Sequence, residues 1–576
     1  MERMRTLDDV EVSYSDLKQI RAHTRLGLFD YLEQRKLLVV FILVAVGFSA
    51  RAIRLDAASL AEDEANKIFA IRAYRQGDFT ANGEHPMVMK LLCYASVQAA
   101  AAWDQTLGKS LGLTVTEETA LRLPNATFGA LTVIPLLLLT STLLGFRIAF
   151  IGSTLWALGL DAIWFNRIVK EDTLLVFFML LGFYLYNRAK GLPAFDVGGQ
   201  ERLYAFAGAA FGLMIASKYF PHYVGLNALF YTMIGYDSRN NRPLTRRMWA
   251  KYFGGLVLAF AILNHALFLP QTWRYLWKYV NEEMLTHHGY LLMDRLFIND
   301  ATQSPGGNAW YFYFLFLWVK LPLPLLAAFI VGLIEIFRRR GDYPESRGYI
   351  FLRMMLICWL PMSLVGVKFL RYSLSLMPLV YMTAAIGIVA IWRVSSSMLR
   401  RLRFEWNLAP QVAAVATALV FVAAPAVTTA NILRSSHPGL WVNSLGRSRV
   451  GYFFPHDEYY DLGARESIRY IAENAEPGAR MASEIPGVVQ YYLERYNRPD
   501  IRSEILSQPG FNLSEGRPDF VLLQRGRVYF ENRENFELIE SNFPVVQAST
   551  YEGAPAAQVF RLGRKEEIAM PPIDNP

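Results

Sequence analysis

Long apolar runs recur along most of this sequence, and they constrain the fold more than any other feature. A helix needs about 20 predominantly apolar residues to cross the hydrocarbon core of a bilayer. Runs of about that length occur at residues 37–55, 122–145, 148–165, 173–189, 203–217, 219–236, 250–270, 309–337, 349–367, 372–393 and 409–432. The series predicts a polytopic α-helical membrane protein with about 11 transmembrane helices.

The composition agrees with lipid surroundings. Of the 576 residues, 53% are hydrophobic and only 19% are charged, and the mean hydropathy is +0.20. The net charge of +8 is distributed in short basic clusters between apolar runs, as in membrane proteins, so nucleic-acid binding is not expected. Cys93 and Cys358 lie in apolar surroundings and have no metal-ligand spacing.

The segment 86–103 decides the predicted topology. Only Leu91–Trp103, about 13 residues, is free of charge, which suits a helix lying in the membrane interface. If this segment does not cross, all the large basic clusters fall on one side, which the positive-inside tendency makes the cytoplasm. We therefore predict a cytoplasmic N-terminus and an extracytoplasmic C-terminus.

The same pattern predicts the domain organisation. Residues 1–36 form a cytoplasmic arm, and residues 37–435 form a transmembrane domain with external loops at 56–121 and 271–308. Interfacial helices are expected in the first loop. Residues 436–576 alternate as a soluble α/β domain does, which predicts a small extracytoplasmic domain. Its expected helices lie near 461–474 and 531–541, and its expected strands lie at Phe520–Leu523 and near 544–549 and 557–562.

Ionisable residues gather on the predicted outer face. Charged groups at membrane depth are costly and usually face a functional cavity. For Arg122 and Arg371, the plainer interpretation is a side chain that anchors a helix end at the interface. The whole set consists of Glu62, Asp63, Glu64, Glu84, His85, Lys90, Arg122, Arg167, Lys170, Glu171, Asp172, Lys218, His222, His287, His288, Lys368 and Arg371.

One motif gives this set a family resemblance. From Asp63 the sequence reads DEANKIFAIRAYRQGDFTANGEHPMVMKLL. It resembles the first external loop of the protein O-mannosyltransferases, within the GT-C superfamily of membrane glycosyltransferases, to which the bacterial lipid A aminoarabinose transferases are related. The family's acidic pair matches Asp63–Glu64, and its His-Pro-Pro-x-x-Lys element matches His85 and Lys90, with Met87 in place of the second proline.

Further stretches agree with the family in order along the chain. They are Arg122-Leu-Pro-Asn, Asn166-Arg-Ile-x3-Asp172, Gly212-Leu-x3-Ser-Lys218, His288-Gly, Lys320-Leu-Pro-Leu-Pro and Lys368-Phe-x-Arg-Tyr. Eukaryotic members carry a large β-rich domain in the loop that here spans only 271–308. The short loop implies a prokaryotic member, located in the cytoplasmic (inner) membrane.

The resemblance implies a glycosyltransferase that moves one hexosyl or pentosyl unit, with inversion, from a polyprenyl-phosphate donor to an acceptor hydroxyl on the external face. Such transfer needs a carboxylate to take the acceptor proton. We expect Asp63 to be this base, with Glu64 and Asp172 as further catalytic candidates. The donor phosphate needs cations, and the candidates are Arg167, Lys218, Lys368 and Arg371. Residues expected to bind or position substrate are His85, Lys90, Arg122, His287 and His288.

Other features stay open at this level. No cofactor is predicted, and a divalent cation remains an open alternative, with Asp63, Asp172 and His288 as its ligands if one binds. The acceptor can be a protein, a lipid or a glycan. The alternative function is a transporter or flippase for a lipid-linked or anionic substrate. It is disfavoured because the sequence shows no inverted repeat and its charges gather at one face.

Overall fold

The computed structural model of this protein describes residues 28–219, 222–234, 243–278, 281, 289–299, 308–339, 346–401, 409–435, 437–511, 513 and 516–563. The chain divides into two compact units, residues 1–42 and 43–576. The described part of the first unit contains helix α2 (Leu28–Gln34) and the start of α3 (Lys36–Ala52). All the residues of the candidate site described below belong to the second unit.

Each predicted apolar run coincides with one or more helices. These helices are α3, α7 (Glu117–Leu131), α8 (Val133–Leu144), α9 (Phe146–Leu158), α10 (Leu160–Phe165), α11 (Asp172–Lys190), α12 (Val197–Ser217), α13 (His222–Ile234), α14 (Arg246–Leu263), α16 (Phe312–Lys320), α17 (Leu323–Arg338), α18 (Ser346–Trp359), α19 (Met377–Arg401), α20 (Ala409–Ala418) and α21 (Ala424–Ser435). Within the described residues, three helical stretches are long and apolar enough to cross a membrane: Glu117–Leu144, Met377–Arg401 and Gln411–Arg434. The number of spans and their orientation stay predictions.

Small residues allow two helix pairs to pack with their backbones close together. A Cβ on Gly212 of α12 would lie 2.3 Å from the carbonyl oxygen of Leu256 in α14. A Cβ on Gly332 of α17 would likewise clash with the carbonyl of Thr383 in α19. Close approach at small residues is typical of helix packing within membranes, where lipid supplies no hydrophobic driving force between helices. The described helices therefore pack as expected for a polytopic membrane protein.

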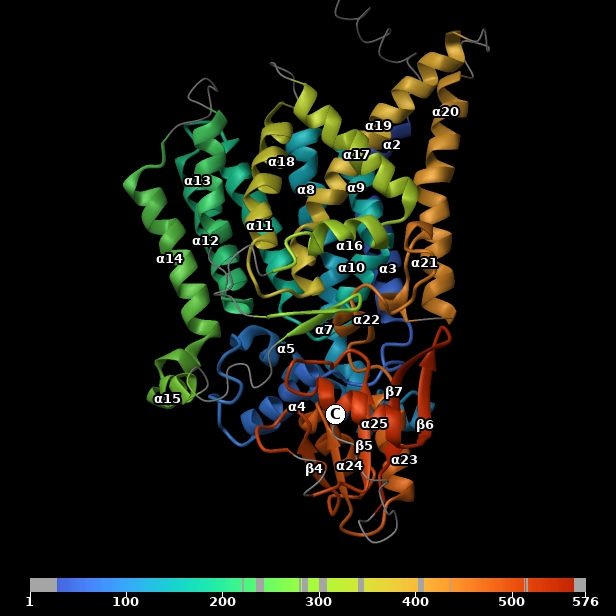
Figure 1. Cartoon of the computed structure of the whole chain (residues 1–576). Helices are drawn as coiled ribbons and strands as arrows, with labels where there is room; N and C mark the ends of the chain where they lie inside the picture. The colour runs from blue at the N-terminus through green and yellow to red at the C-terminus, as the bar shows by residue number, and fades with distance from the viewer. Residues whose placement is uncertain are drawn as a thin grey trace, which may run out of the picture. The chain divides into compact units, whose positions relative to one another are not determined.

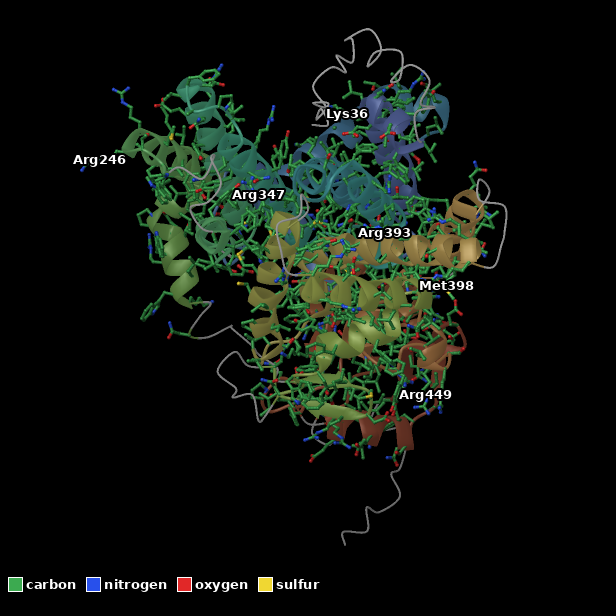
Figure 2. The ribbon with its side chains drawn as sticks, turned by 90° about the horizontal axis from the view of Figure 1, so that it is seen from above. Lys36, Arg246, Arg347, Arg393, Met398 and Arg449 are labelled. Atoms are coloured by element: carbon green, nitrogen blue, oxygen red, sulfur yellow. The ribbon has the colours of Figure 1, made fainter. Side chains whose placement is uncertain are left out.

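Basic residues at the ends of several helices lie opposite the C-terminal sheet. In Figure 1, the start of α14 and the end of α19 lie at one end of the helices, and the sheet lies at the other. Figure 2 views the molecule from the first of these ends, with Arg246 of α14, Arg347 of α18 and Arg393 of α19 labelled. This separation agrees with the predicted topology, in which the basic loops are cytoplasmic.

The C-terminal segment contains the predicted sheet. Five strands pair in the order β4-β3-β5-β7-β6, with β3 parallel to both β4 and β5, and β7 antiparallel to both β5 and β6. The turn between β6 and β7 places Glu552 and Gly553 at positive φ, as a two-residue hairpin requires. The elements are α22 (Pro455–Tyr459), α23 (Ala464–Asn474), β3 (Arg480–Ser483), α24 (Pro486–Arg495), β4 (Arg502–Ile505), β5 (Phe520–Gln524), α25 (Arg533–Asn542), β6 (Val545–Tyr551) and β7 (Ala554–Arg561).

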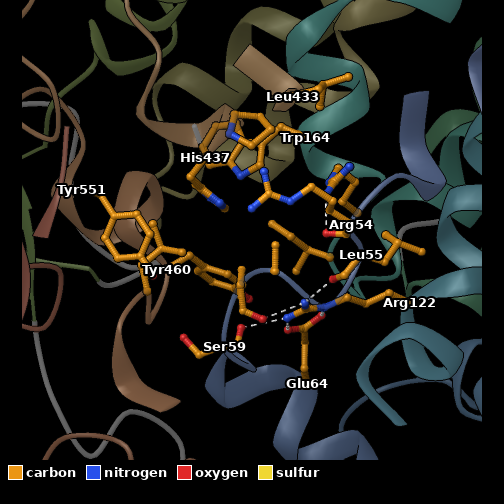
Figure 3. Close-up of a pocket in the computed structure, with 16 residues that line it drawn as sticks. Arg54, Leu55, Ser59, Glu64, Arg122, Trp164, Leu433, His437, Tyr460 and Tyr551 are labelled. Carbon is orange, nitrogen blue, oxygen red and sulfur yellow. Dashed lines mark hydrogen bonds and ion pairs between the residues drawn. The ribbon is translucent and has the colours of Figure 1, made fainter. Parts of the chain in front are cut away.

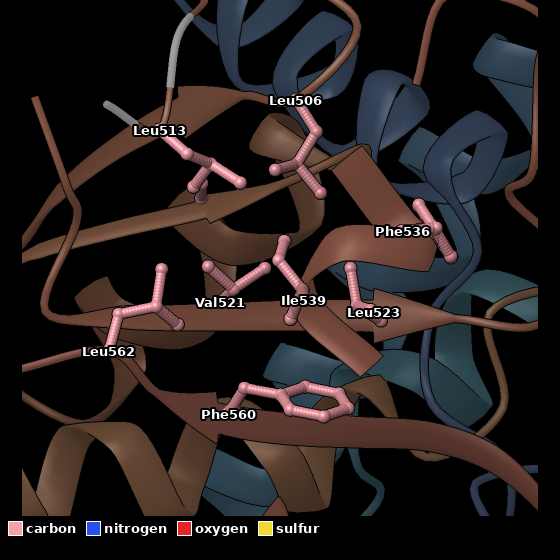
Figure 4. Packing of buried hydrophobic residues seen from close by; sticks show 9 residues of the cluster. Leu506, Leu513, Val521, Leu523, Phe536, Ile539, Phe560 and Leu562 are labelled. Carbon is pink, nitrogen blue, oxygen red and sulfur yellow. The ribbon is translucent and has the colours of Figure 1, made fainter. Parts of the chain in front are cut away.

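An apolar core holds this sheet to a covering helix. Val521 and Leu523 of β5 and Phe560 of β7 pack with Phe536 and Ile539 of α25 (Figure 4). The two helices and three strands predicted for this segment are confirmed within a few residues. The strands β3 and β4 were not predicted, because each has only four residues and β4 is largely exposed. The division of the chain at residues 36 and 435 stays a prediction.

Candidate active site

The acidic pair lies in the first turn of helix α4 (Glu62–Arg75). Carboxylates are favoured there because the helix dipole places partial positive charge at its N-terminus. The Glu64 side chain accepts the backbone N–H of Ala61 at 3.0 Å, which caps the helix. Successive side chains on a helix point about 100° apart. Asp63 and Glu64 therefore face different surroundings although they are adjacent in the sequence.

Glu64 is enclosed in a network of hydrogen bonds. Arg122 of α7 donates two of them, from Nε to Oε1 at 2.9 Å and from Nη2 to Oε2 at 2.6 Å. The backbone N–H of Val169 donates another to Oε1 at 3.0 Å. Glu64 is 1% exposed and Arg122 is 4% exposed. A bidentate pair of this kind fixes α4 against α7 and leaves Glu64 little capacity to contact a substrate.

Asp63 has the opposite environment. Its carboxylate forms an ion pair with Lys170, accepts a hydrogen bond from the Tyr460 hydroxyl at 2.8 Å, and lies 3.9 Å from the Arg371 guanidinium. The side chain keeps 27% of its surface exposed. Burial raises its pKa, but the cations Lys170, Arg371 and Lys67 outweigh burial and hold the pKa well below its usual value. Asp63 is therefore ionised at neutral pH.

A cavity of about 560 Å³ opens beside Asp63. Its volume lies within the range of roughly 300–1,000 Å³ that is common for small-molecule sites. The cavity walls come from α4, from the loop before α5 (Met87–Trp103), from residues Phe369 and Arg371, and from the C-terminal segment. The charged or polar side chains that line it include Glu62, Asp63, Glu84, His85, Arg371, His456, Tyr460 and Arg527. Its volume exceeds the volumes of four other cavities among the described residues.

Tyr460 reaches this cavity through an unusual backbone conformation. Its φ is +38°, and Asp461 follows with φ of +64°. Two consecutive non-glycine residues in the left-handed region are strained, and such strain clusters at functional sites. Asp461 is held by Arg527, whose guanidinium also contacts Glu62 at 2.7 Å. These contacts fix the C-terminal segment against the start of α4.

The histidine and lysine of the predicted loop motif have different positions. The His85 side chain lines the cavity, and its Nδ1 lies 3.7 Å from Glu171. Burial lowers the pKa of His85 to about 3, so the ring is neutral at physiological pH. Lys90 is 1% exposed and donates to the backbone carbonyls of Asn82 and His85. Lys90 therefore holds the loop, and His85 is the member of the motif that faces the cavity.

The predicted phosphate-binding cations do not form one cluster. Only Arg371 lines the Asp63 cavity. Lys218 pairs with Asp172 at 2.5 Å, and Asp172 lines a small neighbouring cavity together with Lys170 and Arg371. Lys368 is fully buried and donates to the carbonyls of Met362 and Ser363. Arg167 donates to the carbonyls of Ile53 and Arg54 and lines a separate pocket.

Several residues of the site were not predicted from the sequence. Lys170, which pairs with Asp63, lies in a turn that is visibly charged in the sequence. Nothing in that turn distinguishes Lys170 from a side chain that only anchors a helix end at the membrane interface. Lys67 pairs with Glu171 at 2.9 Å, and both side chains are almost completely buried. Tyr460 and Arg527 come from the C-terminal segment, and no local pattern in the sequence marks them.

Two of the predicted residues, His287 and His288, lie outside the described residues. The predicted metal ligand set of Asp63, Asp172 and His288 is therefore not tested as a whole. Within the described part of the chain, no three His, Cys, Asp or Glu side chains are grouped closely enough to hold a metal ion.

Comparison with solved structures finds relatives of low identity. ArnT from Cupriavidus metallidurans bound to undecaprenyl phosphate is 14% identical, with 91% of this chain and 98% of that chain covered and a TM-score of 0.44. The oligosaccharyltransferase AglB from Archaeoglobus fulgidus, in complex with an inhibitory peptide and a dolichol-phosphate, is 12% identical, with 94% and 75% covered and a TM-score of 0.46. Among curated proteins, none matches significantly.

A family model gives the more specific finding. Residues 99–268 match the family described as dolichyl-phosphate-mannose-protein mannosyltransferase. The matched stretch contains Arg122, Arg167, Lys170, Asp172 and Lys218, and it begins after Asp63 and His85. The match confirms that this chain resembles the protein O-mannosyltransferases, which are membrane glycosyltransferases of the GT-C superfamily.

Proposed function

We propose that this protein transfers a single sugar from a polyprenyl-phosphate donor to an acceptor hydroxyl, with inversion, at the cavity beside Asp63. The observation that carries the proposal is an ionised carboxylate on a cavity of small-molecule size, flanked by two cations. The family match supports a lipid-linked donor. The predicted topology would place this cavity on the extracytoplasmic face.

The chemistry assigns a role to each neighbouring group. The acceptor oxygen attacks the anomeric carbon, the bond from that carbon to the phosphate oxygen breaks, and the electron pair leaves with the lipid phosphate. Asp63 takes the proton of the acceptor hydroxyl as the new bond forms. A single displacement by this route inverts the configuration at the anomeric carbon. Arg371 and Lys170 stabilise the charge on the departing phosphate.

Lys170 and Arg371 also control how strong a base Asp63 is. In the free protein, Lys170 and Arg371 lower the pKa of Asp63 and make it a weak base. A donor phosphate that engages both cations offsets their charge. The pKa of Asp63 then rises towards the value favoured by its burial, so its basicity increases when the donor is bound.

Purified full-length protein in lipid nanodiscs tests the proposal. The protein is incubated with radiolabelled polyprenyl-phosphate sugars and a mixture of protein, lipid and glycan acceptors, and release of polyprenyl phosphate is measured. We expect release that requires an acceptor and is lost in Asp63→Asn. The matched control is Asp78→Asn, an exposed residue that follows α4 outside the cavity. Movement of the intact donor between the two leaflets, without release of phosphate, would instead support the flippase alternative.

A further inference from the structure

A second pocket shares Tyr460 with the Asp63 cavity, and Glu64, which does not line that cavity, is among the residues that line the second pocket. Its volume is about 140 Å³, many times the roughly 10–15 Å³ of cavity volume that one water molecule needs. Figure 3 shows Trp164, His437, Tyr460 and Arg122 arranged around the open space. The pocket is therefore large enough for a small polar group and too small for a whole sugar-lipid donor.

The charge of this pocket is positive. Arg54, Arg122 and Arg167 line it, and Glu64 is the one carboxylate among its lining residues, all of which are described. Glu64 is already committed to Arg122 through two hydrogen bonds. Arg54 donates to the backbone carbonyl of Arg434, and Arg167 donates to the backbone carbonyls of Ala50, Arg51, Ile53 and Arg54. No carboxylate that lines the pocket pairs with Arg54 or Arg167, and Asp56, outside the lining, interacts electrostatically with Arg167.

Two buried hydrogen-bonding atoms on this pocket have no partner. The indole N–H of Trp164 is one, on a side chain that is 98% buried, and Nε2 of His437 is the other. A buried indole N–H almost always has a partner, because losing its hydrogen bond to water is costly. Burial and the nearby cations Arg167, Arg122 and Lys320 lower the pKa of His437 to about 3. The site thus combines positive charge with an unsatisfied donor.

We propose that this pocket is a second anion site, which binds a phosphate group through Arg54, Arg167, His437 and the indole N–H of Trp164. Phosphate oxygens accept hydrogen bonds from several donors at once, and Arg is the side chain best suited to them. The phosphate can come from a lipid headgroup or from solution. Leu433, at the end of the apolar stretch Gln411–Arg434, also lines the pocket and offers a place for the first carbons of a lipid chain.

The test is equilibrium binding to the full-length protein in nanodiscs made of zwitterionic lipid, with monododecyl phosphate and inorganic phosphate as separate probes. Arg54→Gln removes one cation at an exposed position, and Trp164→Phe removes the indole donor but keeps an aromatic ring. Because a hydrogen bond to a charged group contributes about 1.5–3 kcal/mol, Arg54→Gln is expected to weaken binding by about tenfold or more. Trp164→Phe is also expected to weaken phosphate binding, because it removes the indole N–H donor. The matched control is Arg449→Gln, an exposed arginine outside the pocket.

The outcomes separate this proposal from the proposed function. A binding event that both pocket variants weaken and that Arg371→Gln leaves unchanged supports the second site, whether or not Arg371→Gln weakens a separate binding event at the Asp63 cavity and whether or not sugar transfer is observed. Tight binding of monododecyl phosphate alone identifies a lipid headgroup as the source, and equal binding of inorganic phosphate identifies a free anion. If neither probe binds, or if only Arg371→Gln weakens binding, the second site does not exist as proposed.

Discussion

Asp63 and Glu64 are neighbours in the same helical turn, yet their surroundings have little in common. Glu64 is 1% exposed and bonded to Arg122, Ala61 and Val169. Asp63 is 27% exposed and faces a cavity with cations on its rim. The difference shows that an acidic pair in one motif can divide its roles. One carboxylate holds the fold, and the other remains available for chemistry.

The strongest test of this division is Asp63→Asn. Loss of a general base lowers the rate by about 10²–10⁴-fold, and we expect that fall in kcat/KM for sugar transfer. The amide keeps the size of the side chain and can still accept from Tyr460, so the protein should fold. Thermal unfolding in detergent checks the fold. Full turnover by a folded Asp63→Asn variant would remove Asp63 from the mechanism.

Glu64→Gln should show the reverse behaviour. Removing one partner of a buried ion pair leaves Arg122 with an uncompensated charge, which costs about 3–5 kcal/mol. We expect the free energy of unfolding, measured by denaturant titration in mixed micelles, to fall by that amount. The matched control is Glu494→Gln, which breaks the exposed pair with Arg72. If Glu64→Gln were as stable as the wild type but inactive, Glu64 would belong to the chemistry.

Arg371→Gln separates donor binding from catalysis at the same cavity. A hydrogen bond to a charged group contributes about 1.5–3 kcal/mol, so the Kd for a polyprenyl-phosphate analogue should rise about ten- to a hundredfold. Lys368→Gln offers a comparison, because the Lys368 ammonium donates to backbone carbonyls and does not line the cavity. Unchanged donor affinity in Arg371→Gln would place the phosphate elsewhere.

Donor binding should also become weaker at alkaline pH. Burial and the neighbouring Arg371 lower the pKa of Lys170 to about 8, although Asp63 opposes the shift. Lys170 is charged below this pH and becomes neutral above it, so donor affinity should fall as the pH rises through 8. Because one proton is linked to donor binding, the fall should be at most about tenfold per pH unit. Lys170→Arg, which keeps its charge, should remove the dependence, and a pH-independent wild type would contradict the role of Lys170.

The smallest expected change in the free energy of unfolding comes from breaking the surface contact between α4 and α24. Arg72 pairs with Glu494 at 2.8 Å, and both side chains are about 40% exposed. Exposed ion pairs contribute about 0–1 kcal/mol. The Glu494→Gln control should therefore change the free energy of unfolding by less than about 1 kcal/mol and leave sugar transfer unchanged. A larger loss would mean that the C-terminal segment depends on this contact for its position.

Much of the fold could be predicted because its signals are local. Each apolar run from 37–55 to 409–432 coincides with helix, and β5 coincides with the run of apolar residues at Phe520–Leu523. The short strands β3 and β4 escaped prediction because four residues carry too little periodicity. The candidate site was predicted in part. Asp63, His85 and Arg371 meet at one cavity, whereas Lys368 and Arg167 point to carbonyls elsewhere.

The sequence alone determined the helices, the cluster of acids and cations near the predicted outer face, and the resemblance to a family. These features depend on the composition and spacing of neighbouring residues. Only the tertiary structure decided which acid faces the cavity. Arg122, which encloses Glu64, lies 58 residues away in the chain, and Tyr460, which contacts Asp63, lies 397 residues away. Contacts over such separations depend on how the helices and the C-terminal segment pack, and no local pattern encodes them.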